Sequence, residues 1–111
     1  MVAKGWVPEA GDIVWLNFDP QAGHEQAGHR PAVVLSPASY NRPTGLMLCV
    51  PLTTRMKGYP FEVPVASSRG GVALADQVRS LDWRARKAAL KGKASASELA
   101  AIRVRARELL G

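Results

Sequence analysis

Groups that could act on a phosphodiester lie beside the apolar runs of this sequence. The loop before residue 31 carries Glu25, His29 and Arg30, and the run Ala-Val-Val-Leu at 32–35 follows it directly. That run is short, β-branched and bracketed by prolines, which predicts a strand buried on both faces, with Arg30 at its fixed end. Loops anchored in this way commonly hold binding or catalytic groups.

Two further loops add polar groups. Thr53, Lys57 and Tyr59 follow the apolar run 46–51, while two polar residues interrupt the apolar stretch 72–81. Polar side chains inside such a stretch are better explained by lining a site than by burial without partners. The candidate site residues are therefore Glu25, His29, Arg30, Thr53, Lys57, Tyr59, Asp76 and Gln77.

This set of residue types suits RNA. An arginine can bind phosphate oxygens through two hydrogen bonds and can stabilise the charge that develops on a pentavalent phosphorus. Hydroxyl and ammonium groups, here Thr53 and Lys57, add donors to the same oxygens, and Tyr59 could stack on an unpaired base. RNA supplies its own nucleophile, the 2′-OH, so no nucleophilic serine or cysteine is required.

Other chemistries fit the sequence less well. The glycine spacing between 23 and 28 lacks the Lys-Ser/Thr pair of a phosphate-binding P-loop. The acidic and histidine residues do not have the spacing of a zinc or two-metal site, so we expect neither a metal nor a cofactor. A His24–His29 acid–base pair is a rival mechanism. Arg30 could instead brace the loop by pairing with Glu25 or Asp76.

Composition limits the class of protein. With 111 residues and 47% hydrophobic content, we expect one domain, 1–111, in the cytoplasm, because neither a membrane-spanning run nor a signal peptide is present. The single cysteine, Cys49, is expected to be a buried thiol.

The net charge is +6, with eleven Lys/Arg against five Asp/Glu after residue 55, which indicates an anionic partner. Trp6 and Trp15 are expected in the core or an interface, and Lys87, Lys91 and Lys93 on a solvated face.

The elements that must position these groups are mainly strands. Strands are predicted at 12–18, 32–35, 46–51, 61–65, 72–81 and 88–93, with a helical turn before Gly45. Ser95 and Glu98 form a capping-box pattern that starts a terminal helix, and this helix has an apolar stripe at Leu99, Ile102, Ala106, Leu109 and Leu110. The pattern predicts a mainly β fold, a small, strongly bent sheet or partly open barrel, with a C-terminal helix.

Six segments, in this order and spacing, resemble the MazF toxins of bacterial type II toxin–antitoxin pairs. They are Gly-Asp-Ile-Val-Trp (11–15), Phe-Asp-Pro (18–20), the stretch from Glu25 to Pro37, Val-Pro-Leu-Thr-Thr (50–54), Lys-Gly-Tyr-Pro-Phe-Glu-Val (57–63) and Gly-Val-Ala-Leu-Ala-Asp-Gln-Val (71–78). The resemblance implies an SH3-like barrel, a homodimer and a metal-independent, sequence-specific endoribonuclease. It also implies cleavage of single-stranded RNA to 2′,3′-cyclic phosphate and 5′-OH ends, and inhibition by a cognate antitoxin with an acidic tail.

The same resemblance implies roles for individual residues. It places the catalytic arginine on Arg30 and the catalytic threonine on Thr53, and Glu25 matches an acid of the motif whose role as the base is less settled. Lys57 and Gln77 match positions expected to contact RNA, whereas family members differ at the position of His29. Two alternatives stay open: a CcdB-like toxin of the same barrel type that inhibits gyrase without catalysis, and an RNA-binding module without turnover.

Overall fold

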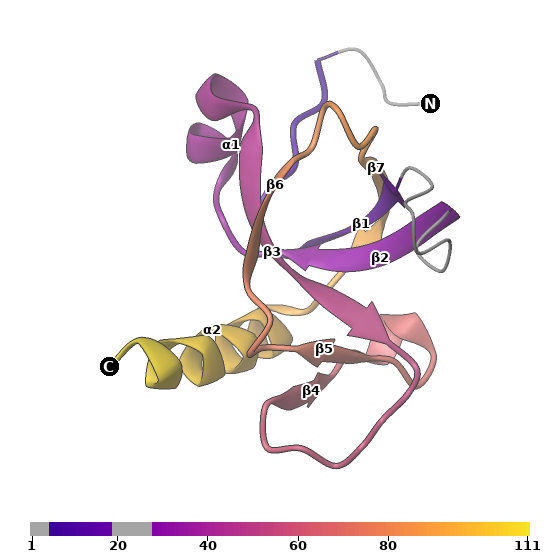
Figure 1. The fold of residues 1–111 in the computed structure, drawn as a ribbon, viewed down its shortest axis with the longest axis vertical. Coiled ribbons are helices and arrows are strands. Elements are labelled where there is room, and N and C mark those ends of the chain that lie inside the picture. Colours follow the sequence, from indigo (N-terminus) through magenta and orange to yellow (C-terminus); the bar gives the residue numbers. More distant parts are fainter. Residues whose placement is uncertain (1–4, 19–27) are drawn as a thin grey trace.

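The structure is a computed structural model that describes residues 5–18 and 28–111. Within these residues an antiparallel sheet has the strand order β4-β5-β3-β2-β1-β7, and β6 pairs with β3 (Figure 1). The elements are β1 (Asp12–Phe18), β2 (Gly28–Val34), α1 (Ala38–Thr44), β3 (Leu46–Thr53), β4 (Glu62–Pro64), the 3₁₀ turn Ala66–Ser68, β5 (Val72–Leu74), β6 (Arg79–Asp82), β7 (Ala89–Lys93) and α2 (Ala96–Leu110). The predicted bent, mainly β fold with a C-terminal helix is confirmed.

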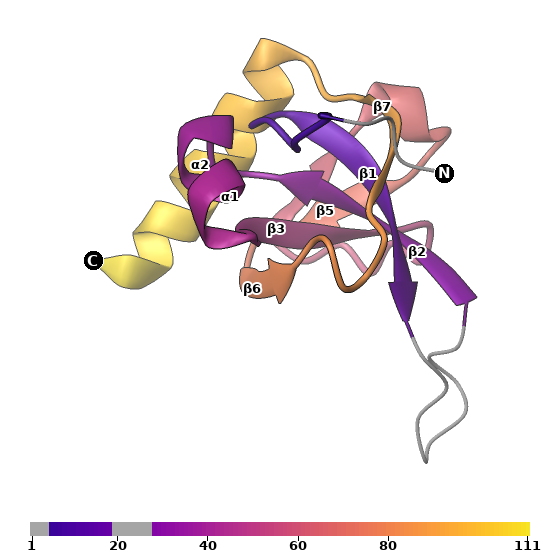
Figure 2. The same cartoon turned by 90° about the horizontal axis from the view of Figure 1, so that it is seen from above.

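Strand β3 bends the sheet because its two halves have different neighbours. On one edge it pairs with β2, and on the other edge it pairs first with β6 and then with β5. The β2 pairing ends at Ala32↔Pro51, whereas β3 continues to Thr53 alongside β5. The ribbon β1–β2 therefore diverges from the ribbon β3–β5 beyond this pair (Figures 1 and 2).

The prediction of one strand over 72–81 is wrong. Leu52 of β3 pairs with Ala73 of β5, and Cys49 of β3 pairs with Arg79 of β6. The two pairs are three residues apart along β3 but six residues apart along the partner segment. The extra residues cannot join the ladder and loop out between β5 and β6. Asp76 and Gln77 lie in this loop and are exposed, so they do not interrupt a buried strand.

Strand β2 begins earlier than predicted. Pro31 lies within β2, opposite Trp15 of β1, and does not precede the strand. A proline is tolerated there because the β2–β3 ladder stops at Ala32, so the edge of β2 at Pro31 has no partner strand among the described residues. Arg30 consequently extends from inside a strand, opposite Leu16, and not from a strand end.

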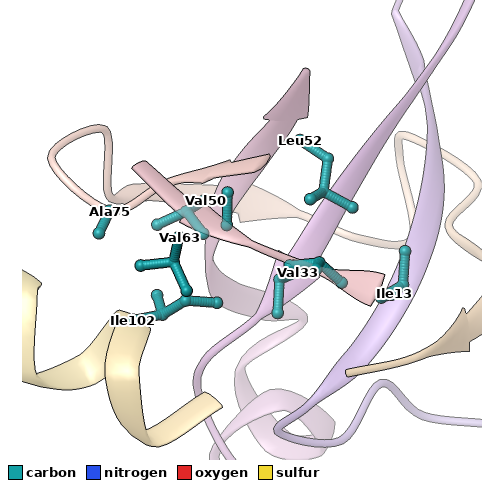
Figure 3. Packing of buried hydrophobic residues seen from close by; sticks show 9 residues of the cluster. Ile13, Val33, Val50, Leu52, Val63, Ala75 and Ile102 are labelled. Carbon is teal, nitrogen blue, oxygen red and sulfur yellow. The ribbon is translucent and has the colours of Figure 1, made fainter. Parts of the chain in front are cut away.

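Two apolar clusters cover the two faces of the sheet, which explains why β1 and β2 are apolar on both faces. One cluster packs under α2 (Figure 3) and contains Ile13, Val33, Val50, Leu52, Val63, Val65, Ala73, Ala75 and Ile102. The other contains Val14, Leu16, Ala32, Val34, Met47, Cys49, Leu81, Trp83 and Ala88. The predicted burial of Cys49 is confirmed.

Helix α2 has the predicted capping box but buries less of its predicted stripe. Ile102 and Ala106 are buried, whereas Leu109 and Leu110 are 54% and 86% exposed. The helix continues beyond the sheet at its C-terminal end (Figure 1), so its last turn has no apolar surface of the described chain to cover. Arg103 donates a hydrogen bond from Nη2 to the carbonyl oxygen of Leu35 at 2.8 Å.

Glu98 joins the start of α2 to the rest of the fold. Its Oε1 accepts a hydrogen bond from the Ser95 amide at 2.8 Å, and its Oε2 accepts one from the Ala66 amide, also at 2.8 Å. The Ser95 side chain accepts in return from the Glu98 amide at 3.1 Å. The Ala66 and Ser95 amides together lower the pKa of the Glu98 carboxyl.

Replacing Glu98 with alanine should lower the free energy of unfolding by about 1–2 kcal/mol, because one cap and one tertiary hydrogen bond are lost. The folded-state pKa lies below the ordinary 4.5, so this contribution is complete above pH 4.5 and declines as the pH falls below it. Urea titrations of wild type and Glu98→Ala across this pH range measure the difference, with Glu108→Ala on the same helix as the control. A difference independent of pH would contradict the assignment.

Candidate active site

The divergence of the two ribbons places Arg30 and Thr53 on opposite sides of a fork. Arg30 lies on β2 before its pairing with β3 begins, and Thr53 is the last residue of β3. The Arg30 side chain is exposed and that of Thr53 is half-buried, and Thr53 Oγ1 accepts a hydrogen bond from the Arg55 amide at 3.1 Å. Both residues line the same two clefts, one on each side of the fork.

The first cleft, here called the arginine cleft, has a volume of about 690 Å³. Its apolar lining includes Leu16, Leu81 and the buried Cys49. Its polar lining comes from the fork, the β5–β6 loop, β6 and the turn before β7, and consists of Arg30, Thr53, Gln77, Arg79 and Arg86. A cleft that combines three guanidinium groups with an apolar surface is suited to a ligand that is both anionic and aromatic.

The second cleft, here called the tryptophan cleft, has a volume of about 780 Å³. Trp15, Arg30, Thr53, Arg55, Ser68 and Lys91 are among its lining residues. Trp15 comes from β1 and Lys91 from β7, which pairs with β1 on the edge away from β2. The sheet order therefore brings residues distant in sequence to one face beside the fork.

A third, smaller cleft of about 220 Å³ adjoins the other two at Thr53. Its lining includes Lys57, Tyr59, Asp76 and Gln77. The β3–β4 loop is held by Glu62, whose carboxylate oxygens accept hydrogen bonds from the Lys57 and Gly58 amides at 2.9 Å each. The Lys57 ammonium lies 5.9 Å from the centre of the Tyr59 ring.

The three clefts bring together most of the residues selected from sequence. Thr53 lines all three, and the others of this group are Arg30, Lys57, Tyr59, Asp76 and Gln77. His29 is exposed and does not line these clefts; its ring lies 6.2 Å from that of Trp15. Glu25 and His24 lie outside the described residues.

Sequence reasoning missed several cleft residues. Arg79 and Arg86 line the arginine cleft, and Trp15, Arg55 and Lys91 line the tryptophan cleft. Trp15 had been expected in the core or an interface and Lys91 on a solvated face. The excess of positive charge after residue 55 was the one sequence signal for Arg79, Arg86 and Lys91.

The buried thiol in the arginine cleft is not a nucleophile. Burial raises the pKa of Cys49 to about 11, although the positive charges of Arg79 and Arg86 oppose the shift. The thiol is therefore protonated at neutral pH, and the thiolate is the reactive form.

Within residues 5–18 and 28–111, no group of three or more His, Cys, Asp or Glu residues could hold a metal ion. In the same part of the chain, no helix has the length and apolar character needed to cross a membrane.

A small bent β-sheet with basic clefts beside a fork has the shape and charge suited to binding an anionic chain. Residues 9–110 match the family of PemK-like, MazF-like toxins of type II toxin–antitoxin systems. The chain belongs to this family, as its resemblance in sequence implied.

Individual relatives support the assignment over the full chain. The Escherichia coli (strain K12) protein named endoribonuclease toxin MazF is 57% identical over 112 residues, covering 100% of both chains. The toxin ChpB of the same strain, also named an endoribonuclease, is 44% identical over 96 residues, covering 78% of this chain and 80% of ChpB. A crystal structure of a MazE–MazF complex (Form-III) from Deinococcus radiodurans matches with a TM-score of 0.88 and 55% identity, covering 96% of this chain and 98% of that chain.

Proposed function

We propose that this MazF-like endoribonuclease toxin cuts single-stranded RNA at the fork between β2 and β3, with Arg30 and Thr53 acting on the scissile phosphodiester. The observation that carries this proposal is that Arg30 and Thr53 both line the two basic clefts that meet at the fork. A strand that runs from one cleft to the other would pass beside both side chains.

The reaction proceeds without a metal ion. The 2′-oxygen of the ribose attacks the adjacent phosphorus, a bond forms between them, and the bond from phosphorus to the 5′-oxygen of the next nucleotide breaks. A base takes the proton of the 2′-OH, and the departing 5′-oxygen gains a proton. The products are a 2′,3′-cyclic phosphate and a 5′-OH, and repeated cleavage of mRNA arrests translation and growth.

Each proposed residue has a role that suits its chemistry. Arg30 binds the non-bridging phosphate oxygens and stabilises the charge they gain in the transition state. The Thr53 hydroxyl donates a hydrogen bond to the same phosphate. Glu25 is the proposed base and lies outside the described residues. The RNA is contacted near the third cleft by Lys57, Tyr59, Asp76 and Gln77. It is also contacted by His29, near the start of β2.

The toxin works as a homodimer in the cytoplasm and is inhibited by a cognate antitoxin. The solved MazE–MazF complexes of Deinococcus radiodurans, whose MazF chains are 55% and 58% identical to this one, support the pairing. An acidic antitoxin tail would complement the charges of Arg79, Arg86 and Lys91 in the clefts. Its binding there would exclude RNA.

Incubating the purified protein with a long single-stranded RNA in excess EDTA tests the proposal. Cleavage at a limited set of sequences is expected, with cyclic phosphate at one end and 5′-OH at the other. A 2′-deoxy nucleotide placed before a mapped cut should protect that cut, because the attacking hydroxyl is missing. Intact RNA at all sequences, or cleavage of the deoxy-substituted position, would contradict the mechanism.

A further inference from the structure

We propose that the tryptophan cleft is a nucleotide subsite for one flank of the RNA: a base beside the cut stacks on Trp15, and Lys91 and Arg55 bind the adjoining phosphate. The inference rests on the proposed function and adds where one side of the substrate lies. The residues selected from sequence for RNA contact are all distinct from these three.

The setting of Trp15 suits a stacking surface. Its side chain is half-buried, so the ring is held by the fold but part of it remains open to the cleft. The Lys91 ammonium lies 5.3 Å from the centre of the ring, and the His29 ring lies 6.2 Å away at an interplanar angle of 33°. An aromatic ring next to a cation is the combination that binds unpaired bases in single-stranded nucleic acid.

The charge and size of the tryptophan cleft favour a nucleotide. Arg30, Arg55 and Lys91 contribute positive charge, and none of the described lining residues is acidic. The volume of about 780 Å³ lies within the usual range of ligand sites. By contrast, the third cleft contains Glu62 and Asp76 beside its cations, so the tryptophan cleft is the better place for a phosphate.

The path of the strand follows from the shared lining. Arg30, Leu52 and Thr53 line both the arginine cleft and the tryptophan cleft. If the scissile phosphate lies between Arg30 and Thr53, the nucleotides on its two sides enter different clefts. One flank of the substrate therefore contacts Trp15 and the other does not.

Truncated substrates test this asymmetry. Two series of RNAs are shortened stepwise on the 5′ or the 3′ side of a mapped cut, and kcat/KM is measured for wild type, Trp15→Leu and Lys91→Gln. Trp15→Leu should lower kcat/KM for the full RNA at least about fivefold, the lower end of base–aromatic stacking. Lys91→Gln should also lower it, because a contact to the phosphate is lost. For RNA that lacks the flank bound in the tryptophan cleft, the variants should cleave as well as wild type. For RNA shortened on the other flank, the variants should keep their reduced kcat/KM.

Arg105→Gln, an exposed charge on α2, is the matched control and should have no effect on either series. Lys91 is exposed, so Lys91→Gln keeps the test valid even if Trp15→Leu fails to fold. If wild type cleaves RNA but both folded variants lose nothing, or lose the same factor on every RNA, the subsite is refuted. If they lose antitoxin binding alone, the cleft belongs to the antitoxin and the proposal is also refuted.

Tryptophan fluorescence provides a readout independent of turnover. RNA with a 2′-deoxy nucleotide at the cut is titrated into the protein, and stacking on Trp15 should quench its emission. Trp15→Phe should abolish the quench, whereas Trp6→Phe should keep it, because Trp6 packs edge-to-face on Trp83 with ring centres 6.3 Å apart. Quenching by this RNA, with no cleavage of unmodified RNA, would refute the proposed function and support the subsite. Cleavage of unmodified RNA, with no quenching, would support the proposed function and refute the subsite.

Discussion

Replacing Arg30 with alanine should lower the single-turnover rate of RNA cleavage by about 100- to 1000-fold, the usual loss when one donor to a developing anionic charge is removed. Arg30 borders both principal clefts, so its guanidinium can reach the phosphate at the point where the strand crosses the fork. Quenched-flow or gel assays with excess enzyme measure the chemical step free of product release.

Two variants show whether the loss belongs to the guanidinium. Arg30→Lys keeps the positive charge but loses the two-pronged geometry, so its rate should fall between wild type and Arg30→Ala. Arg105→Ala removes an exposed charge on α2 and should leave the rate unchanged. An Arg30→Ala enzyme with a normal melting temperature and a rate within a few-fold of wild type would exclude Arg30 from the reaction.

Replacing Asn41 with alanine should lower the free energy of unfolding by about 3 kcal/mol, since buried hydrogen-bond partners would be left unsatisfied. Asn41 is fully buried in α1. Its Nδ2 donates to the carbonyl oxygens of Pro8 at 2.8 Å and Ser36 at 3.0 Å, and its Oδ1 accepts from the Ser36 hydroxyl at 2.6 Å. One amide thus ties the segment before β1 to the β2–α1 connection.

Asn41→Asp should be at least as destabilising at neutral pH, because it places a carboxylate against two carbonyl oxygens. Urea denaturation measures both changes, and Ser39→Ala, at an exposed position of the same helix, is the control. A loss below about 1 kcal/mol for Asn41→Ala would show that water replaces the amide without cost.

Much of the fold could be predicted because its signals are local. The strand pattern of residues 12–18, the glycine at position 45 that ends α1 and the capping box of Ser95 and Glu98 depend on neighbouring residues. The errors depend on distant pairing. Pro31 fits inside β2 because the pairing of β2 with β3 ends at Ala32, and the break at Asp76 arises from the way β5 and β6 share the edge of β3.

The candidate site could be predicted in part for the same reason. Arg30 and Thr53 stand in motifs whose residue types and order suggested phosphate chemistry before the fold was considered. Arg86 and Lys91 stand in no such motif, and the turn before β7 and the β1–β7 pairing bring them to the clefts. Trp15 was assigned to a core or interface because the sequence cannot reveal that its side chain is only half-buried and lines a cleft.

A double-mutant cycle on Arg30 and Thr53 tests most directly whether the two side chains act on one phosphodiester at the fork. Single-turnover rates are measured for wild type, Arg30→Ala, Thr53→Val and the double variant, with melting temperatures confirming that each is folded. Residues that act as a unit give non-additive losses, so the double variant should be about as slow as Arg30→Ala alone. Losses that multiply independently would contradict a shared role at the same phosphate.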